Sequence, residues 1–170
     1  FYAATKKSNE VMAHSYSNIY KLPCTGIRLF TVYGPYGRPD MSLFKFTKAI
    51  LESKIVNLFN FGNHVRDFTY IDDATNAVVK LIDKPPRKKI PYAIYNIASS
   101  KPRNLKFFLK IIEKFLDKKA KIKYKTLQIG DVKKTFASIK LLQKKVGFIP
   151  NIDIEQGIEK FIEWYRNDKQ

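Results

Sequence analysis

Apolar residues recur along this chain with two spacings, one typical of amphipathic helices and one typical of short buried strands. Glycine and proline mark the turns between them. The helical spacing predicts helices over residues 2–20, 42–53, 72–84, 104–118, 138–145 and from about 154 onward. Short segments between the turns predict strands over residues 24–30, 55–59, 67–70, 93–98 and 121–126, and the first of these is expected to be buried. Strands that alternate with helices in this way predict an α/β fold.

Two of the predicted helices begin at residues whose side chains favour the N-cap position. Asp72 and Asn104 each carry a side-chain oxygen that can accept a hydrogen bond from a free backbone N–H of the first turn. The helix after Asn104 also has a strong apolar stripe opposite its lysines, made of Leu105, Phe108, Ile111, Ile112 and Phe115. Burial of that stripe is therefore expected.

The composition of the 170 residues is that of a folded protein. Hydrophobic residues make up 45% and charged residues 28%, which excludes a disordered chain. The longest apolar runs are only a few residues, so no transmembrane helix and no membrane partner are expected. No signal peptide is visible, and the single cysteine, Cys24, forms no internal disulfide. These features together predict a cytoplasmic location.

The net charge of +17 raises the hypothesis of a nucleic-acid-binding module. Lysine supplies most of this charge, and the lysines are spread over the polar faces of the predicted helices. No recognisable nucleic-acid module and no aromatic-rich RNA-binding motif is visible. We therefore expect no nucleic-acid partner, although a basic nucleic-acid-binding module stays open as an alternative.

The first chemically suggestive pair is Tyr2 and Lys6, which form a Tyr-x-x-x-Lys motif. Four residues apart on a helix places both side chains on one face, one turn apart. A nearby ammonium favours the phenolate form of a tyrosine, so the pair predicts a tyrosine able to take a proton from a hydroxyl group. The same spacing also arises by chance, and the alternative is an ordinary pair on a helix surface.

Several segments taken together resemble one family. The sequence at 2–10 resembles the catalytic helix of extended short-chain dehydrogenases/reductases of the NAD-dependent epimerase/dehydratase family. Residues 28–41 resemble their strand and loop beside the nicotinamide and sugar, and residues 62–73 resemble their diphosphate-binding segment. Gly130-Asp-Val and Gly147-Phe-Ile-Pro resemble their C-terminal landmarks. The order and spacing match over nearly the whole chain.

The resemblance implies a specific place for this chain in a larger fold. Residues 1–170 would be the C-terminal portion of the enzyme, which comprises the catalytic helix, the last strands of a Rossmann-like parallel sheet and the small substrate-binding domain. NAD would be the cofactor. No Gly-x-x-Gly-x-x-Gly phosphate loop is present, so that element is expected in an N-terminal half before residue 1. The isolated fragment is accordingly expected to be inactive.

The resemblance also implies residue roles. Tyr2 would be the acid/base on the sugar 4-hydroxyl, and Lys6 would bind the nicotinamide ribose. The remaining cofactor contacts would come from the wall beside the nicotinamide, made of Tyr33, Gly34 and Pro35. The substrate-binding residues would be Thr31, Arg38, Arg66 and Asp131, with Arg66 on the diphosphate and Asp131 on the uridine ribose. His14 and His64 lack the spacing of metal ligands, and no metal site is expected.

Within the superfamily, Thr31 followed by Arg38-Pro-Asp-Met resembles the UDP-glucuronate 4-epimerase branch. The implied activity interconverts UDP-glucuronate and UDP-galacturonate through a 4-keto intermediate. Another nucleotide-sugar epimerase or dehydratase, or a fragment without catalysis, remains an alternative. The helix at 2–20 resembles one of the two helices through which family members pair, which is compatible with a homodimer.

Overall fold

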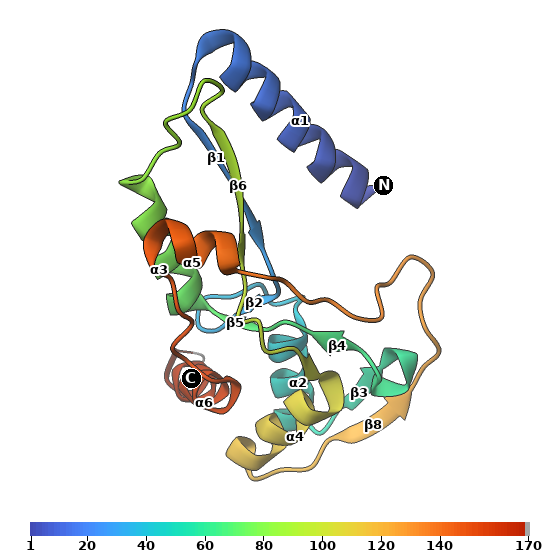
Figure 1. The fold of residues 1–170 in the computed structure, drawn as a ribbon. Coiled ribbons are helices and arrows are strands. Elements are labelled where there is room, and N and C mark those ends of the chain that lie inside the picture. The colour runs from blue at the N-terminus through green and yellow to red at the C-terminus, as the bar shows by residue number, and fades with distance from the viewer. Residues whose placement is uncertain (169–170) are drawn as a thin grey trace.

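Two long parallel strands form the spine of one half of the molecule (Figure 1). The computed structural model describes residues 1–168. In it β1 (Cys24–Leu29) pairs with β6 (Tyr92–Ile97), from Cys24 opposite Tyr92 to Leu29 opposite Ile97. Parallel strands need a long crossover connection. The chain between β1 and β6 is such a connection, and it forms much of the other half of the molecule.

Helices cover the β1–β6 pair from two sides (Figure 1). On one side lies α1 (Tyr2–Tyr20), and on the other lie α3 (Ile71–Ile82) and α5 (Lys140–Val146). The side of α3 and α5 holds a hydrophobic core made of Ala74, Ala77, Leu81, Ile97, Ala98, Ala137, Ile139, Leu142 and Phe148. These buried contacts attach the helices to the strand pair.

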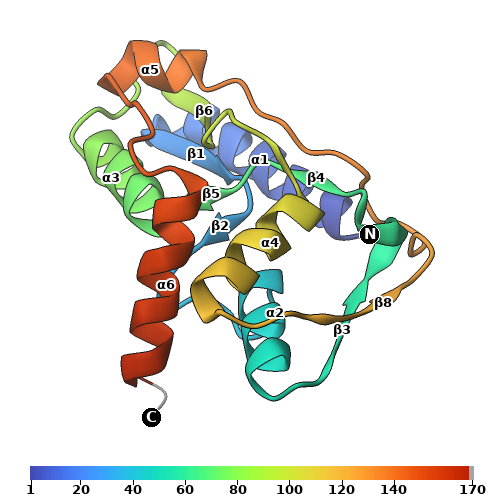
Figure 2. The same ribbon diagram turned by 90° about the horizontal axis from the view of Figure 1, so that it is seen from below.

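A second core lies among three helices of the other half. Figure 2 shows α4 (Leu105–Leu116) beside α2 (Ser42–Leu51) and α6 (Ile154–Asp168). The apolar stripe expected on α4 faces this core, where Phe108 and Ile112 are fully buried. Phe108 stacks on Phe68, with ring centroids 4.2 Å apart.

The other strands are short and form pairs. The parallel pairs are β2 (Val32–Tyr33) with β5 (Thr69–Tyr70), and β3 (Ile55–Leu58) with β8 (Lys121–Tyr124). The antiparallel pair is β4 (Val65–Arg66) with β7 (Arg103–Asn104), and the short 3-10 helix η1 (Phe59–Gly62) precedes β4. Of the strand expected over 67–70, only Thr69–Tyr70 is a strand, and β4 lies just before the expected range.

The α/β fold and the predicted helices are confirmed, but two local expectations are wrong. Asp72 does not cap α3, because Tyr70 occupies the N-cap position without a side-chain hydrogen bond. The neighbouring Asp73 instead accepts hydrogen bonds from the backbone N–H groups of Asn151 (3.1 Å) and Ile152 (3.0 Å), so it holds a distant loop. The cap at Asn104 is confirmed, with its Oδ1 accepting from Lys106 N at 2.8 Å.

The second wrong expectation is that the strand at 24–30 is buried. Ile27 and Leu29 of β1 are exposed. Within the described chain, β1 pairs with β6 along one edge only, and α1 does not cover these two side chains. The apolar residues of α1 are exposed as well, namely Val11, Met12, Tyr16, Ile19 and Tyr20. No helix within residues 1–168 has the length and apolar character needed to cross a bilayer.

Polar contacts rather than a hydrophobic core attach α1 to β1. Arg28 donates from Nε and Nη2 to the two carboxylate oxygens of Glu10, at 2.6 and 2.7 Å. Lys7 adds a contact to Glu10 at 2.9 Å, and the Tyr92 hydroxyl donates to the Glu10 carbonyl at 3.0 Å. The hydrogen bonds from Arg28 and then Lys7 lower the pKa of Glu10 from 4.5 to about 2. Glu10 thus links α1 to both β1 and β6.

Replacement of Glu10 by Gln should weaken the docking of α1 in a pH-dependent way. A carboxylate whose pKa is lowered by folding contributes stability above its unfolded pKa of 4.5, and the contribution disappears as the pH falls to about 2. The thermal midpoint of Glu10→Gln should therefore lie below that of the unsubstituted protein at neutral pH, and the difference should vanish towards pH 2. Thermal unfolding followed by circular dichroism across this range measures the effect. A matched change at an exposed residue of α6, Glu159→Gln, should show no such trend, and a pH-independent difference at Glu10 would contradict the assignment.

Candidate active site

Three hollows lie along β1 and the loop that follows it. The first lies between α1 and β1 and is lined by Tyr2, Lys6 and Leu29 among others. The second lies in the loop after β1 and is lined by Thr31 and Arg38 among others. The third has Arg66, Asp131 and His64 among its lining residues, and it shares Thr31, Met41, Ser42 and Phe68 with the second.

Tyr2 and Lys6 lie on one face of the first turns of α1, as their spacing predicts. Lys6 Nζ is 5.5 Å from the centroid of the Tyr2 ring, and 74% of the surface of Tyr2 is exposed. Both side chains face the cleft beside β1. The Tyr2 side chain is also close enough to Arg38 to contribute, after Asp40, to raising the pKa of the Arg38 guanidinium. Tyr2 therefore lies near Arg38, which lines the second hollow.

The loop after β1 begins with an unusual backbone at Thr31. Its φ is +22°, which is rare for a β-branched residue. Two hydrogen bonds hold this conformation, because Thr69 donates from its N–H to Thr31 O at 3.1 Å and from its hydroxyl to Phe30 O at 2.8 Å. Backbone strain of this kind collects at functional sites. It places Thr31 on the wall common to the second and third hollows.

The Tyr33 side chain points away from the open cleft and into the core. Its ring packs edge-on against Phe68, Tyr70 and Phe108, with centroids 5.7 to 6.1 Å apart. Burial raises the pKa of the Tyr33 phenol far above its usual range, and the hydroxyl donates to the Asp153 carbonyl at 3.4 Å. A methyl group at Gly157 of α6 would overlap the Tyr33 hydroxyl, which explains the glycine there. Tyr33 therefore borders the second hollow while its ring is held by packing in the core.

Gly34 and Pro35 complete the turn after β2. Gly34 has a φ of +139°, and a Cβ there would lie 2.6 Å from Ile71 Cγ2. Only glycine fits this position. Pro35 follows in the turn and is partly buried. The wall formed by these residues is consequently fixed by packing against α3.

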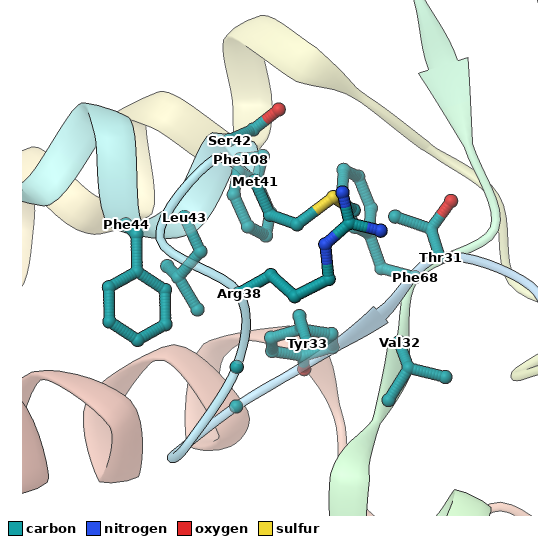
Figure 3. Close-up of a pocket in the computed structure, with 12 residues that line it drawn as sticks. Thr31, Val32, Tyr33, Arg38, Met41, Ser42, Leu43, Phe44, Phe68 and Phe108 are labelled. Atoms are coloured by element: carbon teal, nitrogen blue, oxygen red, sulfur yellow. The ribbon is translucent and has the colours of Figure 1, made fainter.

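Arg38 extends along the second hollow towards Met41 and Thr31 (Figure 3). Its Nε donates to Asp40 Oδ1 at 3.0 Å, and its Nη2 forms a second hydrogen bond with the same carboxylate. The hydrogen bonds with Asp40 raise the pKa of Arg38 and lower that of Asp40. The side chain of Arg38 is 75% exposed, so the guanidinium is accessible as well as charged.

Arg66 and Asp131 meet in the third hollow although 65 residues separate them in sequence. Arg66 Nη2 donates to Asp131 Oδ1 at 3.1 Å, and Arg66 Nη1 donates to the Val65 carbonyl at 3.1 Å. Burial lowers the pKa of Arg66, and the Asp131 carboxylate acts in the opposite direction. His64 lies beside this pair, with Nε2 3.0 Å from Asp131 Oδ2. A partly desolvated guanidinium of this kind is suited to binding a phosphate.

Asp67 is a structural residue of the site to which the sequence analysis assigned no role. It is fully buried, and its Oδ1 accepts from the N–H (3.0 Å) and the hydroxyl (2.8 Å) of Ser99. Its Oδ2 accepts from Ala137 N at 3.2 Å. The signal in the sequence was a carboxylate directly after Arg66, inside a predicted strand. Asp67, the direct neighbour of Arg66, therefore joins the segments at Ser99 and Ala137.

The family model described as the NAD dependent epimerase/dehydratase family matches residues 1–98, more than half of the chain. The chain belongs to the NAD dependent epimerase/dehydratase family. Both Tyr2-x-x-x-Lys6 and the Arg66 segment lie within the matched region of the family.

Individual members of the family are similar over almost the whole chain. Protein CapI of Staphylococcus aureus is 48% identical over 96% of this chain and 53% of its own length. A probable UDP-glucuronate 4-epimerase of Rhizobium meliloti is 42% identical over 96% of this chain and 52% of its own. The solved structure of a UDP-glucuronic acid 4-epimerase from Bacillus cereus, in complex with UDP-glucuronic acid and NAD, superimposes with a TM-score of 0.91 at 30% identity. That match covers 98% of this chain and 52% of the other, so the chain spans about half the length of these family members.

The comparison confirms the expected family and its Rossmann-type fold. The structure adds that Thr31, Arg66 and Asp131 line one cavity, and that Arg38 lies in the adjoining hollow. Tyr33 is placed with its side chain in the core, and Gly34 lines the second hollow. The roles of all these residues stay predictions.

Replacement of Asp67 by Ala should destabilise the protein strongly. Three donors from Ser99 and Ala137 would lose their acceptor in a buried place, which is expected to lower the free energy of unfolding by about 3 kcal/mol. Asp67→Asn, which keeps one carbonyl oxygen, should cost less. Urea unfolding measures both, with Asp83→Ala at the exposed end of α3 as the control. A cost at Asp67 no larger than at Asp83 would show that the carboxylate does not hold these segments.

Proposed function

We propose that this chain is the catalytic and substrate-binding portion of an NAD-dependent UDP-glucuronate 4-epimerase. The observation that carries the proposal is the convergence of Thr31, Arg66 and Asp131 on one cavity that adjoins the hollow of Arg38. We further propose that the phosphate loop for the dinucleotide belongs to sequence outside residues 1–170, and that activity requires both parts. The half-length coverage of the relatives supports this division.

The third hollow supplies groups for the nucleotide end of the substrate. Arg66 carries a forked set of donors, which matches the oxygens of a diphosphate in charge and geometry. Asp131 carries carboxylate oxygens that can accept from the hydroxyls of the uridine ribose. Because the two side chains meet at 3.1 Å, diphosphate and ribose would bind to neighbouring groups, as they are neighbours in the nucleotide.

The α1–β1 cleft fits the nicotinamide end of NAD. Tyr2 and Lys6 both face this cleft, and a lysine can donate to the ribose hydroxyls of the cofactor. Tyr33, Gly34 and Pro35 would form the wall beside the nicotinamide. When bound, NAD supplies the acceptor and donor of hydride for the sugar C4.

Tyr2 would move the proton in this reaction. As phenolate it accepts the proton of the sugar 4-hydroxyl, and it returns the proton to the C4 oxygen when the 4-keto sugar is reduced on its other face. Lys6, one turn away on the same face of α1, would bind the cofactor ribose and so hold the nicotinamide beside the phenol. The exposure of Tyr2 towards the cleft is compatible with contact to a bound sugar.

Thr31 and Arg38 support the choice of a uronate. The carboxylate at C5 of glucuronate needs hydrogen-bond donors once it leaves water, because an unpaired charge is costly to bury. Thr31 offers a hydroxyl donor on the common wall, and Arg38 offers an accessible guanidinium. A neutral hydroxymethyl sugar would leave such donors unsatisfied. The alternative within the family is an epimerase or dehydratase for a neutral nucleotide sugar.

In the full-length enzyme, Tyr2→Phe should lower kcat by about 10²- to 10⁴-fold, because it removes the proton acceptor and keeps the ring. Lys6→Met should cause a loss of similar size. The change Tyr16→Phe on the same helix serves as control, since Tyr16 is exposed and far along α1. Steady-state assays with UDP-glucuronate measure all three. Near-normal turnover of Tyr2→Phe would remove Tyr2 from the proton-transfer role.

The full-length enzyme should also prefer UDP-glucuronate to UDP-glucose in kcat/KM. Thr31→Val, which keeps the shape and removes the hydroxyl, should reduce kcat/KM for the acidic substrate by about tenfold more than for the neutral one, the size of one lost hydrogen bond to a charged group. Parallel assays of both substrates provide the comparison. Equal kcat/KM values in the unsubstituted enzyme would overturn the uronate assignment but leave the family membership unaffected.

A further inference from the structure

His64 is a buried polar residue in the third hollow that the proposed roles above do not use. It lies between η1 and β4, and 3% of its surface is exposed. Its backbone carbonyl accepts from Leu105 N at the start of α4, at 2.8 Å. The ring is therefore positioned by its backbone and by packing, and its nitrogen Nε2 faces the cavity side where Asp131 lies.

The side chains of His64 and Asp131 lie close together but are not hydrogen-bonded. Nε2 lies 3.0 Å from Asp131 Oδ2 without forming a hydrogen bond, and within the described chain it has no other hydrogen-bond partner. The other carboxylate oxygen, Oδ1, accepts from Arg66 at 3.1 Å. A buried donor without an acceptor is costly, so a small rotation of the carboxylate towards His64 would be favourable if Arg66 no longer held it.

Asp131 lies in a loop with few attachments to the rest of the molecule. Backbone hydrogen bonds fix the ends of the loop, from Lys125 N to Leu58 O (2.9 Å) and from Val65 N to Lys133 O (3.0 Å). Between these ends, the hydrogen bond that joins the loop to the body, as far as residues 1–168 are described, is the one from Arg66 to Asp131. If Arg66 turned to a ligand, this attachment would be lost unless another group replaced it.

We propose that His64 is a positioning residue that holds Asp131 in place when Arg66 turns to the diphosphate of the substrate. His64 Nε2 then donates to Asp131 Oδ2, and Oδ1 becomes free to accept from the ribose hydroxyls. The exchange keeps the loop over the cavity and replaces one charged hydrogen bond of Asp131 by another. This inference rests on the proposed function, because it takes Arg66 as the ligand of the diphosphate.

A matched pair of substitutions tests the role of the nitrogen. His64→Gln keeps an N–H donor at nearly the same distance from the backbone, whereas His64→Met has a similar length and no donor. In the full-length protein, His64→Met should raise the Kd for UDP, measured by calorimetry, by about tenfold, the effect of one lost hydrogen bond. His64→Gln should stay within about threefold of the unsubstituted protein. Amide hydrogen exchange over residues 126–132 in the presence of UDP should be faster in His64→Met than in His64→Gln.

A double-mutant cycle separates positioning from a general structural effect. In an Asp131→Ala background, His64→Met should have no further effect on the Kd for UDP, because its influence passes through Asp131. An equal loss in both backgrounds, or an equal loss with Gln and Met, would overturn the role of His64. Unchanged UDP binding in His64→Met would also overturn it while leaving the proposed function intact. Failure of the unsubstituted protein to bind UDP would instead overturn the proposed function, and the inference with it.

Discussion

The buried carboxylate of Asp67 is the interaction on which the arrangement of the site depends. It accepts hydrogen bonds from Ser99, just after β6, and from Ala137, just before α5, while its own N–H donates to the Thr135 hydroxyl at 3.2 Å. These segments come from three distant parts of the chain. A charged group is tolerated in the interior only when its acceptor sites are used, so the three segments must stay together for the fold to form.

The same carboxylate explains why Arg66 faces the cavity. Neighbouring residues in an extended backbone point to opposite sides, and the side chain of Asp67 is committed to the interior. Arg66 is therefore directed to the third hollow, where Asp131 and His64 lie. Thr135 and Ala137 are hydrogen-bonded to Asp67, so the end of the loop that carries Asp131 lies beside Arg66. One buried carboxylate thus supports a charged pair that is only partly buried.

The two sides of the site differ in how firmly they are held. The wall of Thr31, Tyr33 and Gly34 is fixed by aromatic packing and by close contact with α3. Tyr2 and Lys6, in contrast, lie on a helix that is attached by Glu10, Arg28 and Tyr92, and whose apolar residues are exposed. Tyr2 and Lys6 are therefore held less firmly than the opposite wall.

The sequence by itself determined the local elements and the chemistry of individual residues. The 2–20 helix, the Asn104 cap and the Phe108 stripe could be predicted because helical periodicity and capping depend on nearby residues. The motif at Tyr2 and Lys6 could be predicted for the same reason. Only the tertiary structure decided that Asp73 caps a distant loop, that Asp67 joins three segments and that the Tyr33 ring faces the core. It also decided that His64 lies beside Asp131. These contacts join residues far apart in the chain, and no spacing along the sequence records which buried polar groups will meet.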